Sequence, residues 1–374
     1  MTSRPRNPYE NVNWQTTLRV QGSTHLHCTS QEALRRALAE GLEFVTLSNY
    51  HPSMPWWPLS TMRENTTRFR MPSYVQDGKV VYKELRFREA YRQWGEDVSQ
   101  LPADEGELLF PNVPNDLLEA PNAEHHFFTD TTVYLHVTAP GCALTSGRFD
   151  RSADSPLERH GIRKGMGLPW REGFAALLDS LIVPDGGGII INHPQWSHLP
   201  VRFLCELLDF DERVLGMEIV NADCAVNCTA GSEPQWDEVL STGRQCWGFC
   251  AQDHPKEGTP LTGRSILLVK ERTPEACLRA YRQGCFYGAL KGQGLRFESI
   301  EFDGRTIHAR CDREAVLLLI SRQGVVKEVW TGKELTYTVP DSERAEHVFF
   351  RVTAEQLECR EKLYSQPIML MRNS

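Results

Sequence analysis

Segments typical of strands and segments typical of helices alternate along residues 169–284, and this alternation limits the possible folds more than any other feature. The short apolar runs "GGGIIINH" and "LGMEIVN" are typical of buried strands, and amphipathic segments such as "WREGFAALLDSL" lie between such runs. The last helix has Thr273 as its expected N-cap and Gly284 just past its end. Strands that alternate with helices over this length predict a parallel sheet, open or closed into a barrel.

A further strand, helix and strand are expected near the N-terminus. The segment "TTLRVQGSTHLH" is β-like, and "LEFVTLS" is a short apolar run of the kind that buried strands show. Between them, Thr29 followed by Glu32 predicts a helix start, and Gly41 supplies the residue that ends the helix. Together these elements form a βαβ unit.

Three histidines flank the helix of this unit. His25 and His27 share one face of the first strand, and His51 follows the second strand at its C-terminal end. Parallel α/β folds build their sites at that end. A single histidine there is most often a hydrogen-bonded structural residue, whereas three converging neutral imidazoles make a metal site. This stretch alone leaves both interpretations open.

An irregular, tryptophan-rich insertion occupies residues 52–122. It contains an amphipathic segment at 83–98 that we expect to form a helix, and an insertion of this length in a compact domain is usually functional or a lid.

The pattern changes after about Gly294, where alternating runs follow one another without helices. Asp303 and Gly304 join the first two runs and give a two-residue hairpin signal. We therefore expect one domain over residues 1–292 and a small all-β sandwich over residues 293–374.

Composition argues against several classes of protein. The net charge of −8 disfavours a general nucleic-acid binder. No apolar run is long enough to span a bilayer, and the N-terminal "MTSRPRNPYENVNW" has no apolar signal core, so we expect a cytoplasmic protein without a membrane partner.

The 11 cysteines are scattered through expected strands and helices, as free buried thiols are in a reducing compartment. Two pairs, Cys224 with Cys228 and Cys246 with Cys250, have a C-x3-C spacing that is looser than the usual zinc knuckle. Buried thiols are therefore the favoured interpretation of these pairs.

Residue types that bind metals gather at the expected strand ends. They are His25, His27, His51, Glu124, His136, His193, Asp253 and His254. Chance does not readily place such residues at so many strand ends. We therefore favour a metal site over a purely structural role for these side chains. Imidazole and carboxylate ligands together suit zinc, manganese or iron, and one glutamate can bridge two ions.

Four motifs in order give the chain a family resemblance: "THLHC", "SNYHP", "INHP" and "AQDHP". Over roughly residues 16–290 it resembles the PHP family, the polymerase and histidinol phosphatase superfamily of metal-dependent hydrolases. The segment "GCFYGALKGQGLRFESIEFDGRTIHARC" is similar to the one that joins such a domain to a C-terminal β-sandwich in some members. The resemblance implies a distorted (β/α)7 barrel that holds two or three metal ions.

The resemblance also implies site residues. The implied ligands are His25, His27, His51, His136, His193 and His254, with Glu124 as the bridging carboxylate. Asn221 in "EIVN" matches a position close to the site, and we include it among the substrate-binding candidates. Ser48 and Asn49 stand where the family often has Thr and Asp, and "CTSQEAL" lacks a residue that adds a further ligand in many members, which argues against a third ion.

The last motif departs from the D-x-H of the family, because Gln252 occupies the position of the aspartate. Asp253 is adjacent to His254 and would point away from the metals on a regular strand. Either the strand ends and a turn swings Asp253 inward, or the site lacks this carboxylate. We favour the turn, since Pro255 restricts His254 but leaves Asp253 free. Asp253 would then be a ligand and could protonate a leaving group, with His254 beside it.

Two divalent ions lower the pKa of a shared water, so that a bridging hydroxide exists at neutral pH and can attack phosphorus. We therefore expect a metal-dependent phosphoesterase that acts on a small phosphorylated metabolite. The loop of residues 141–167 supplies Arg148 and Arg151 as partners for an anionic substrate, although a solvated loop is at least as good an interpretation of either one.

Two other functions stay open. Metal-activated water also attacks amides and lactones, so the same site could belong to an amide or lactone hydrolase. Alternatively, a degenerate barrel could act as a binding protein whose β-sandwich and tryptophan-rich insertion recognise a partner.

Overall fold

The computed structural model describes residues 7–28, 30–49, 57–59, 69–76, 79–85, 113–144, 165–255, 262–290, 294–343, 348–356, 358 and 361–370. The α-helices in these residues are α1 (Gln31–Ala39), α4 (Trp170–Asp179), α5 (Val201–Leu208), α6 (Glu233–Ser241) and α7 (Pro274–Gln283). None of them is long and apolar enough to cross a membrane.

The larger of two main sheets has 11 strands. Its strands are β1 (Leu18–Ser23), β2 (Phe44–Val45), β5 (Leu118–Glu119), β11 (Gly263–Val269), β12 (Phe286–Leu290), β13 (Phe297–Phe302), β14 (Thr306–Ile320), β15 (Val326–Thr338), β16 (Phe349–Gln356), β17 (Glu361–Ser365) and β18 (Ile368–Met369). The order is β13-β14-β16-β17-β12-β11-β1-β2-β5, with β15 paired to β14 and β18 paired to β16.

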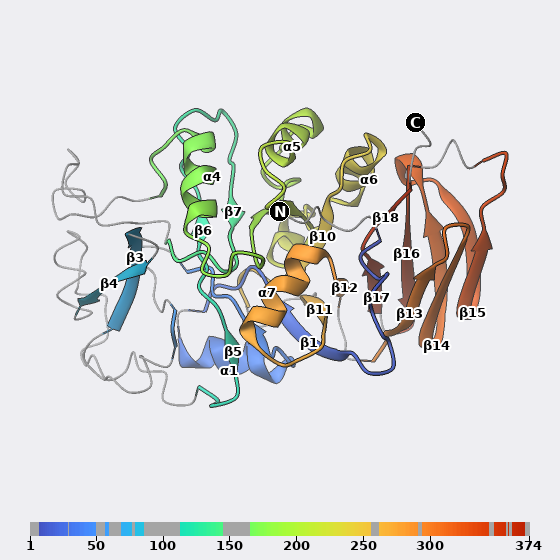
Figure 1. Ribbon diagram of the computed structural model, residues 1–374, viewed down its shortest axis with the longest axis horizontal. Coiled ribbons are helices and arrows are strands. Elements are labelled where there is room, and N and C mark those ends of the chain that lie inside the picture. The colour runs from blue at the N-terminus through green and yellow to red at the C-terminus, as the bar shows by residue number, and fades with distance from the viewer. Residues whose placement is uncertain are drawn as a thin grey trace.

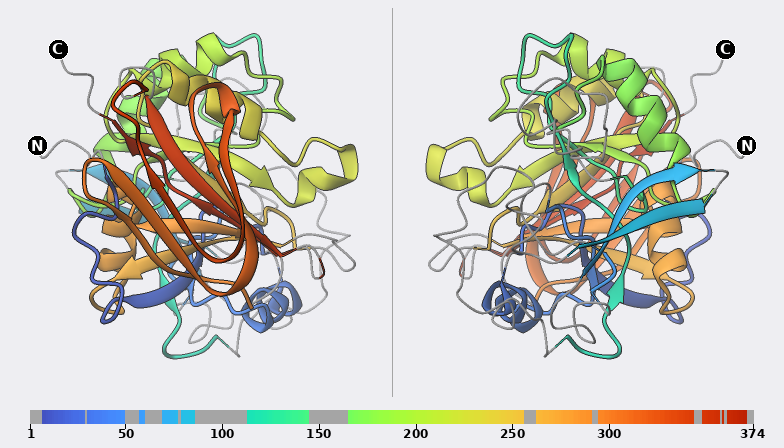
Figure 2. Two further views of the ribbon diagram at one scale, coloured as in Figure 1. Left: turned by 90° about the vertical axis from the view of Figure 1, so that its right-hand side faces the viewer. Right: turned by 90° about the vertical axis from the view of Figure 1, so that its left-hand side faces the viewer.

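The second sheet has five strands in the order β10-β9-β8-β7-β6. They are β6 (Glu124–His125), β7 (Val137–Thr138), β8 (Ile189–Ile191), β9 (Val214–Asn221) and β10 (Trp247–Ala251). A separate hairpin pairs β3 (Phe69–Gln76) with β4 (Lys79–Leu85). The hairpin and the C-terminal strands lie at opposite ends of the molecule (Figure 1), and the right-hand view of Figure 2 places the hairpin in front.

The expected (β/α)7 barrel is wrong. A barrel of that kind needs parallel neighbours throughout, but β1 pairs antiparallel with β11, and β11 pairs antiparallel with β12 although α7 lies between them in the chain. In the second sheet, β7 is antiparallel to both of its neighbours. Among the named strands of the described residues, the parallel pairs are β1 with β2, β2 with β5, β8 with β9, and β9 with β10, and an isolated parallel bridge joins Leu26 to Asp253.

The described strands also do not form the separate C-terminal β-sandwich that we expected. β17 pairs with β12 and β16 pairs with β17, so strands from the C-terminal region continue the sheet that contains β1. These strands cross in front in the left-hand view of Figure 2. The division of the chain into residues 1–292 and 293–374 stays a prediction.

Most of the individual elements are confirmed. α1 links β1 to β2, and the two strands pair in parallel as a βαβ unit requires. The expected start at Thr29 is off by one residue, because the N-cap of α1 is Ser30, whose Oγ accepts a hydrogen bond from the backbone N–H of Ala33 at 3.2 Å. Gly41 follows the helix with a φ of 91°. The helix expected at 83–98 is wrong at its start, because residues 83–85 belong to β4, and its remainder lies outside the described residues.

Buried side chains hold the second sheet against three helices. Phe174 of α4, Leu204 of α5 and Trp236 of α6 are fully buried in one apolar cluster with residues of β8 and β9. Burying a side chain of this size stabilises the fold by about 1.5–3 kcal/mol. This packing fixes the ends of β8, β9 and β10, which carry much of the candidate site.

Candidate metal centre

The segment that follows β1 carries His25 and His27, and its backbone is paired with Asp253. The N–H of Asp253 donates to the carbonyl oxygen of His25 at 2.9 Å, and the N–H of His27 donates to the carbonyl oxygen of Asp253 at 2.8 Å. The Oγ of Ser48 accepts from the Leu26 N–H at 3.0 Å. Two loops that are far apart in sequence thus fix the three candidate ligands together.

Asn49 holds the same segment one residue further along. Its Oδ1 accepts from the Cys28 N–H at 3.1 Å, and its Nδ2 donates to the Cys28 carbonyl at 2.6 Å. Ser48 and Asn49 therefore position the backbone of the H-x-H motif.

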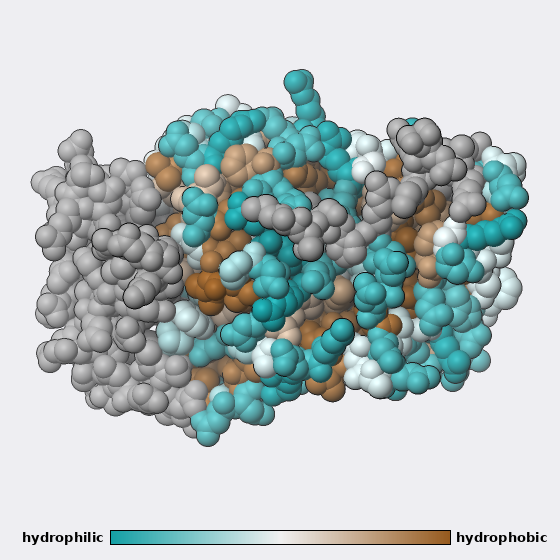
Figure 3. All heavy atoms as spheres, viewed as in Figure 1, coloured by the Kyte–Doolittle hydropathy of each residue, from teal (hydrophilic) through white to brown (hydrophobic). Residues whose placement is uncertain are grey.

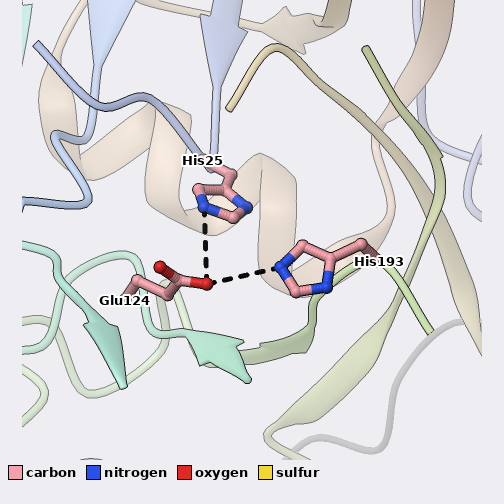
Figure 4. Close-up of side chains that lie close together, drawn as sticks. All are labelled: His25, Glu124 and His193. Carbon is pink, nitrogen blue, oxygen red and sulfur yellow. Dashed lines mark hydrogen bonds and ion pairs between the residues drawn. The ribbon is translucent and has the colours of Figure 1, made fainter. Parts of the chain in front are cut away.

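Glu124, on β6, lies at the centre of four imidazoles. Its Oε1 is 3.3 Å from Nε2 of His193 and 3.8 Å from Nε2 of His25, and Figure 4 shows both rings turned toward this oxygen. The same Oε1 lies 2.8 Å from Nδ1 of His136. Its Oε2 lies 3.3 Å from Nε2 of His27. The geometry thus places both oxygens of one buried carboxylate among four ring nitrogens that come from three segments of the chain.

Asp253 faces this cluster because the chain turns after β10 ends at Ala251. Its φ is 63°, in the left-handed region, which is uncommon for a residue other than glycine. Its Oδ1 is 3.4 Å from Nε2 of His25, 3.5 Å from that of His27 and 3.6 Å from that of His254. Gln252 instead accepts a hydrogen bond from the Gly263 N–H at 3.3 Å. The inward orientation expected for Asp253 is the one observed.

Glu218, on β9, is a residue of the cluster that sequence reasoning missed. Its Oε1 lies 2.8 Å from Nδ1 of His25. Its Oε2 accepts from the backbone N–H of His193 at 2.7 Å and from Nδ2 of Asn221 at 2.9 Å. A carboxylate that contacts the ring nitrogen not bound to metal fixes the ring orientation and the tautomer of a metal-binding histidine. The signal in the sequence was an acidic residue inside the buried run "LGMEIVN", since such a residue is almost never fully buried without a partner.

Asn221 and Ser197 complete the outer layer of contacts. Nδ2 of Asn221 also donates to Oδ2 of Asp253 at 3.0 Å, and Nδ1 of His193 lies 3.1 Å from Oγ of Ser197. Asn221 is only 1% exposed. Its Nδ2 thus contacts the carboxylates of the cluster, its Oδ1 accepts from the Cys224 N–H at 3.2 Å, and its role in substrate binding stays a prediction.

The cluster shifts the pKa values of its own members. Burial disfavours the charged form of His25, but the carboxylates of Asp253, Glu218 and Glu124 outweigh this effect and raise its pKa to about 10. Burial likewise opposes ionisation of Asp253, yet the imidazoles of His25 and His27 hold its pKa below the usual range. The field of the cluster therefore favours anionic carboxylates and a cation among them.

The donor set fits a divalent metal ion. Three groups of residues each bring ligand atoms within 4.8 Å of one another: His25, Glu124 and His193; His25, His27 and Asp253; and Asp223, Asp253 and His254. Tetrahedral ligands at about 2.1 Å from an ion lie roughly 3.4 Å apart, close to the spacing around Oδ1 of Asp253. Oδ1 of Asp253 is thus farther from each ring nitrogen than in an ordinary hydrogen bond, whereas Nε2 of His25 and Nε2 of His27 lie 3.1 Å apart, within hydrogen-bond distance.

The other expected residues have different positions. The ring of His254 stacks on that of His27 with centroids 4.3 Å apart, and its side chain is 49% exposed. Asp223, in the short helix η4 (Asp223–Asn227), joins the third group and was not foreseen. His51, Arg148 and Arg151 lie outside the described residues. Their roles stay predictions.

The cysteines take no part in these groups. Ten described cysteines are free thiols, and Cys224, Cys246 and Cys250 are buried. None of the metal-type groups found among the described side chains contains a cysteine. Within the described residues, the interpretation of the two pairs as buried thiols agrees with Cys224, Cys246 and Cys250 but is wrong for Cys228, which is exposed.

Comparison with known proteins gives little further information. No protein-family model matches the chain, and no curated protein matches it. Among solved structures, the chain is similar to a two-domain protein from Bacteroides vulgatus ATCC 8482 that contains a predicted PHP-like metal-dependent phosphoesterase. The match has 12% sequence identity and a TM-score of 0.38, and it covers 95% of this chain and 94% of that chain. Identity and score at this level do not establish a shared activity.

Proposed function

We propose that this protein is a metal-dependent hydrolase and that its substrate is a phosphoester. The observation that carries the proposal is the convergence of Nε2 of His25, Nε2 of His193 and Oε1 of Glu124 inside the protein. All three residues are at most 5% exposed. Burying this many ionisable groups is costly unless they are paired or bind a metal.

Two overlapping sets of residues would hold the metal. One set is His25, His27 and Asp253, and the other is His25, Glu124 and His193. A divalent ion bound there would supply Lewis acidity and a water of lowered pKa. The preference for a phosphoester over another bond rests on the four motifs that resemble the PHP family.

The residues of the chain orient and neutralise the site. Glu218 holds Nδ1 of His25, so that Nε2 faces Glu124. Asp253 has a lowered pKa and is therefore a carboxylate at neutral pH, which suits a ligand or a proton acceptor better than a proton donor. His254 is the most exposed of these residues, and we assign it the exchange of protons with the leaving group and with solvent.

The test is hydrolysis with and without metal. Protein purified without chelator is analysed for bound metals and is assayed on phosphomonoesters, phosphodiesters, amides and lactones. The same preparation is then assayed after treatment with EDTA and after addition of zinc or manganese. We expect phosphate release that chelation abolishes and metal restores.

Two other results would contradict this proposal in different ways. Metal-loaded protein that is inert on all phosphoesters but cleaves an amide or lactone would retain the metal site and change the reaction. Protein that neither binds metal nor hydrolyses any of these compounds would favour a binding function.

A further inference from the structure

A pocket of about 280 Å³ lies beside the candidate metal centre. It is lined by Phe127, Phe128, Thr131, Thr132, Val133, Tyr134, Leu135 and His136. The last of these, His136, also contacts Oε1 of Glu124 through its Nδ1 atom at 2.8 Å. One side chain therefore belongs both to the pocket wall and to the cluster.

The walls of this pocket expose aromatic side chains to solvent. Phe127 is 62% exposed and Tyr134 is 71% exposed, the two largest values among the exposed large hydrophobic side chains of the described part of the chain. Phe127 also has a φ of 58°, in the left-handed region that a bulky residue rarely adopts. Strained residues of this kind cluster at functional sites.

Aromatic rings continue from the pocket to the cluster through Trp196. The rings of Tyr134 and Trp196 have centroids 6.2 Å apart, and the ring of Trp196 lies 4.9 Å from that of His193. Trp196 also lies 5.8 Å from the ring of His136. These pairs are tilted or edge-to-face, the arrangements that aromatic rings prefer, so a further planar ring would find partners here.

A second hollow in the described structure has no contact with the candidate metal centre of this kind. It measures about 520 Å³, lies between the N-terminal segment, β11 and α7, and shares no lining residue with the cluster. On the face that carries α7, hydrophobic side chains gather in small groups among hydrophilic ones (Figure 3). The hollow therefore gives no link to the chemistry of the site.

We propose that the pocket beside His136 binds a planar aromatic group of the substrate and thereby places the bond to be cleaved at the metal centre. This inference rests on the proposed function for the cleavage step. The size agrees, since a cavity of about 150 Å³ holds a benzene ring. Among the described residues, those that line the pocket include no lysine or arginine, which suits the uncharged part of a phosphoester.

The test compares ligands that differ only in their organic group. Binding of phenylphosphonate, cyclohexylphosphonate and ethylphosphonate to the metal-loaded protein is measured by calorimetry, and hydrolysis of phenyl phosphate and ethyl phosphate is measured in parallel. We expect the phenyl compounds to be preferred, and Tyr134→Ala to reduce this preference about tenfold, as loss of a stacking partner does. Trp330→Ala, which removes an exposed aromatic residue from β15, should leave the preference unchanged.

The binding measurement distinguishes the proposed aromatic pocket from the proposed hydrolytic reaction. If neither ester is hydrolysed but the preference for phenylphosphonate depends on Tyr134, the pocket stands and the proposed reaction fails. Equal affinity for the phenyl and cyclohexyl compounds would overturn the aromatic assignment. A preference that survives Tyr134→Ala would overturn the assignment of the pocket.

Discussion

Nδ1 of His25 lies 2.8 Å from Oε1 of Glu218, and both side chains are almost wholly buried. This contact leaves Nε2 of His25 directed at Glu124 and Asp253. Because Glu218 also accepts from the backbone of His193, one carboxylate orients two candidate ligands from different strands. The proposed metal affinity should therefore depend on a residue that is not itself a ligand.

Replacing Glu218 with glutamine should weaken metal binding about 10- to 100-fold, the usual effect of losing such an outer partner. The amide keeps the size of the side chain but loses the charge that faces His25. Zinc affinity is measured by competition with a chromophoric chelator, and circular dichroism checks the fold. Glu238→Gln, at an exposed position of α6, is the matched control. Equal affinity in the two variants would contradict the positioning role.

Asp253 and Gln252 should respond differently to substitution. Asp253→Asn removes a charge that lies 3.4 Å from His25, so we expect activity to fall about 100-fold or more. Gln252→Ala removes only the acceptor for the Gly263 N–H, so it should lower stability by about 1–3 kcal/mol with little loss of activity per folded molecule. The measurements are kcat/KM and urea unfolding, and the reverse order of activities would refute the assignment of Asp253.

Metal affinity should rise with pH. The surrounding carboxylates outweigh the effect of burial and raise the pKa of His25 to about 10, so in the metal-free protein this residue is protonated at neutral pH. A metal binds the neutral imidazole, and binding must release that proton. Apparent affinity should then increase about tenfold per pH unit for each proton released. Calorimetry in buffers of different ionisation enthalpy counts the protons, and an affinity that does not change between about pH 6 and pH 8 would contradict this expectation.

A buried ion pair joins the C-terminal strands to the half of the molecule that carries the site. Nε and Nη2 of Arg351, on β16, each donate to a carboxylate oxygen of Asp237, on α6, at 2.7 Å. Arg351→Met leaves the carboxylate buried without its partner and should destabilise the protein by about 3–5 kcal/mol. Arg244→Met breaks an exposed pair with Asp209 and should change stability by less than about 1 kcal/mol. The free energy of unfolding is measured in urea for both variants. A similar loss in the two would contradict the expectation that the buried pair matters more than the exposed one.

Local patterns in the sequence predicted local structure well. The periodicity of "WREGFAALLDSL" and the caps Thr273 and Gly284 are properties of neighbouring residues, and the corresponding helices α4 and α7 form as expected. The inward turn of Asp253 could be predicted because Pro255 restricts only the residue before it. Each of these inferences depends on a few adjacent residues.

Strand direction could not be predicted in the same way. β11 and β12 are joined by a helix, as parallel strands usually are, yet they pair antiparallel, and their outer neighbours β1 and β17 are antiparallel to them as well. Glu218 was missed for a similar reason, since its partner His25 is 193 residues away in the chain. Such relationships depend on tertiary packing, which local patterns do not encode.

The most direct test of the central claim is the metal content of the wild-type protein and of the double variant His25→Ala, His27→Ala. Both proteins are purified without chelator and dialysed against the same zinc and manganese solution. Their metal content is measured by elemental mass spectrometry, and circular dichroism checks that both are folded. The proposed metal centre predicts bound metal in the wild type and its loss, together with hydrolytic activity, in the folded double variant. Full metal occupancy in the double variant, or none in the wild type, would contradict it.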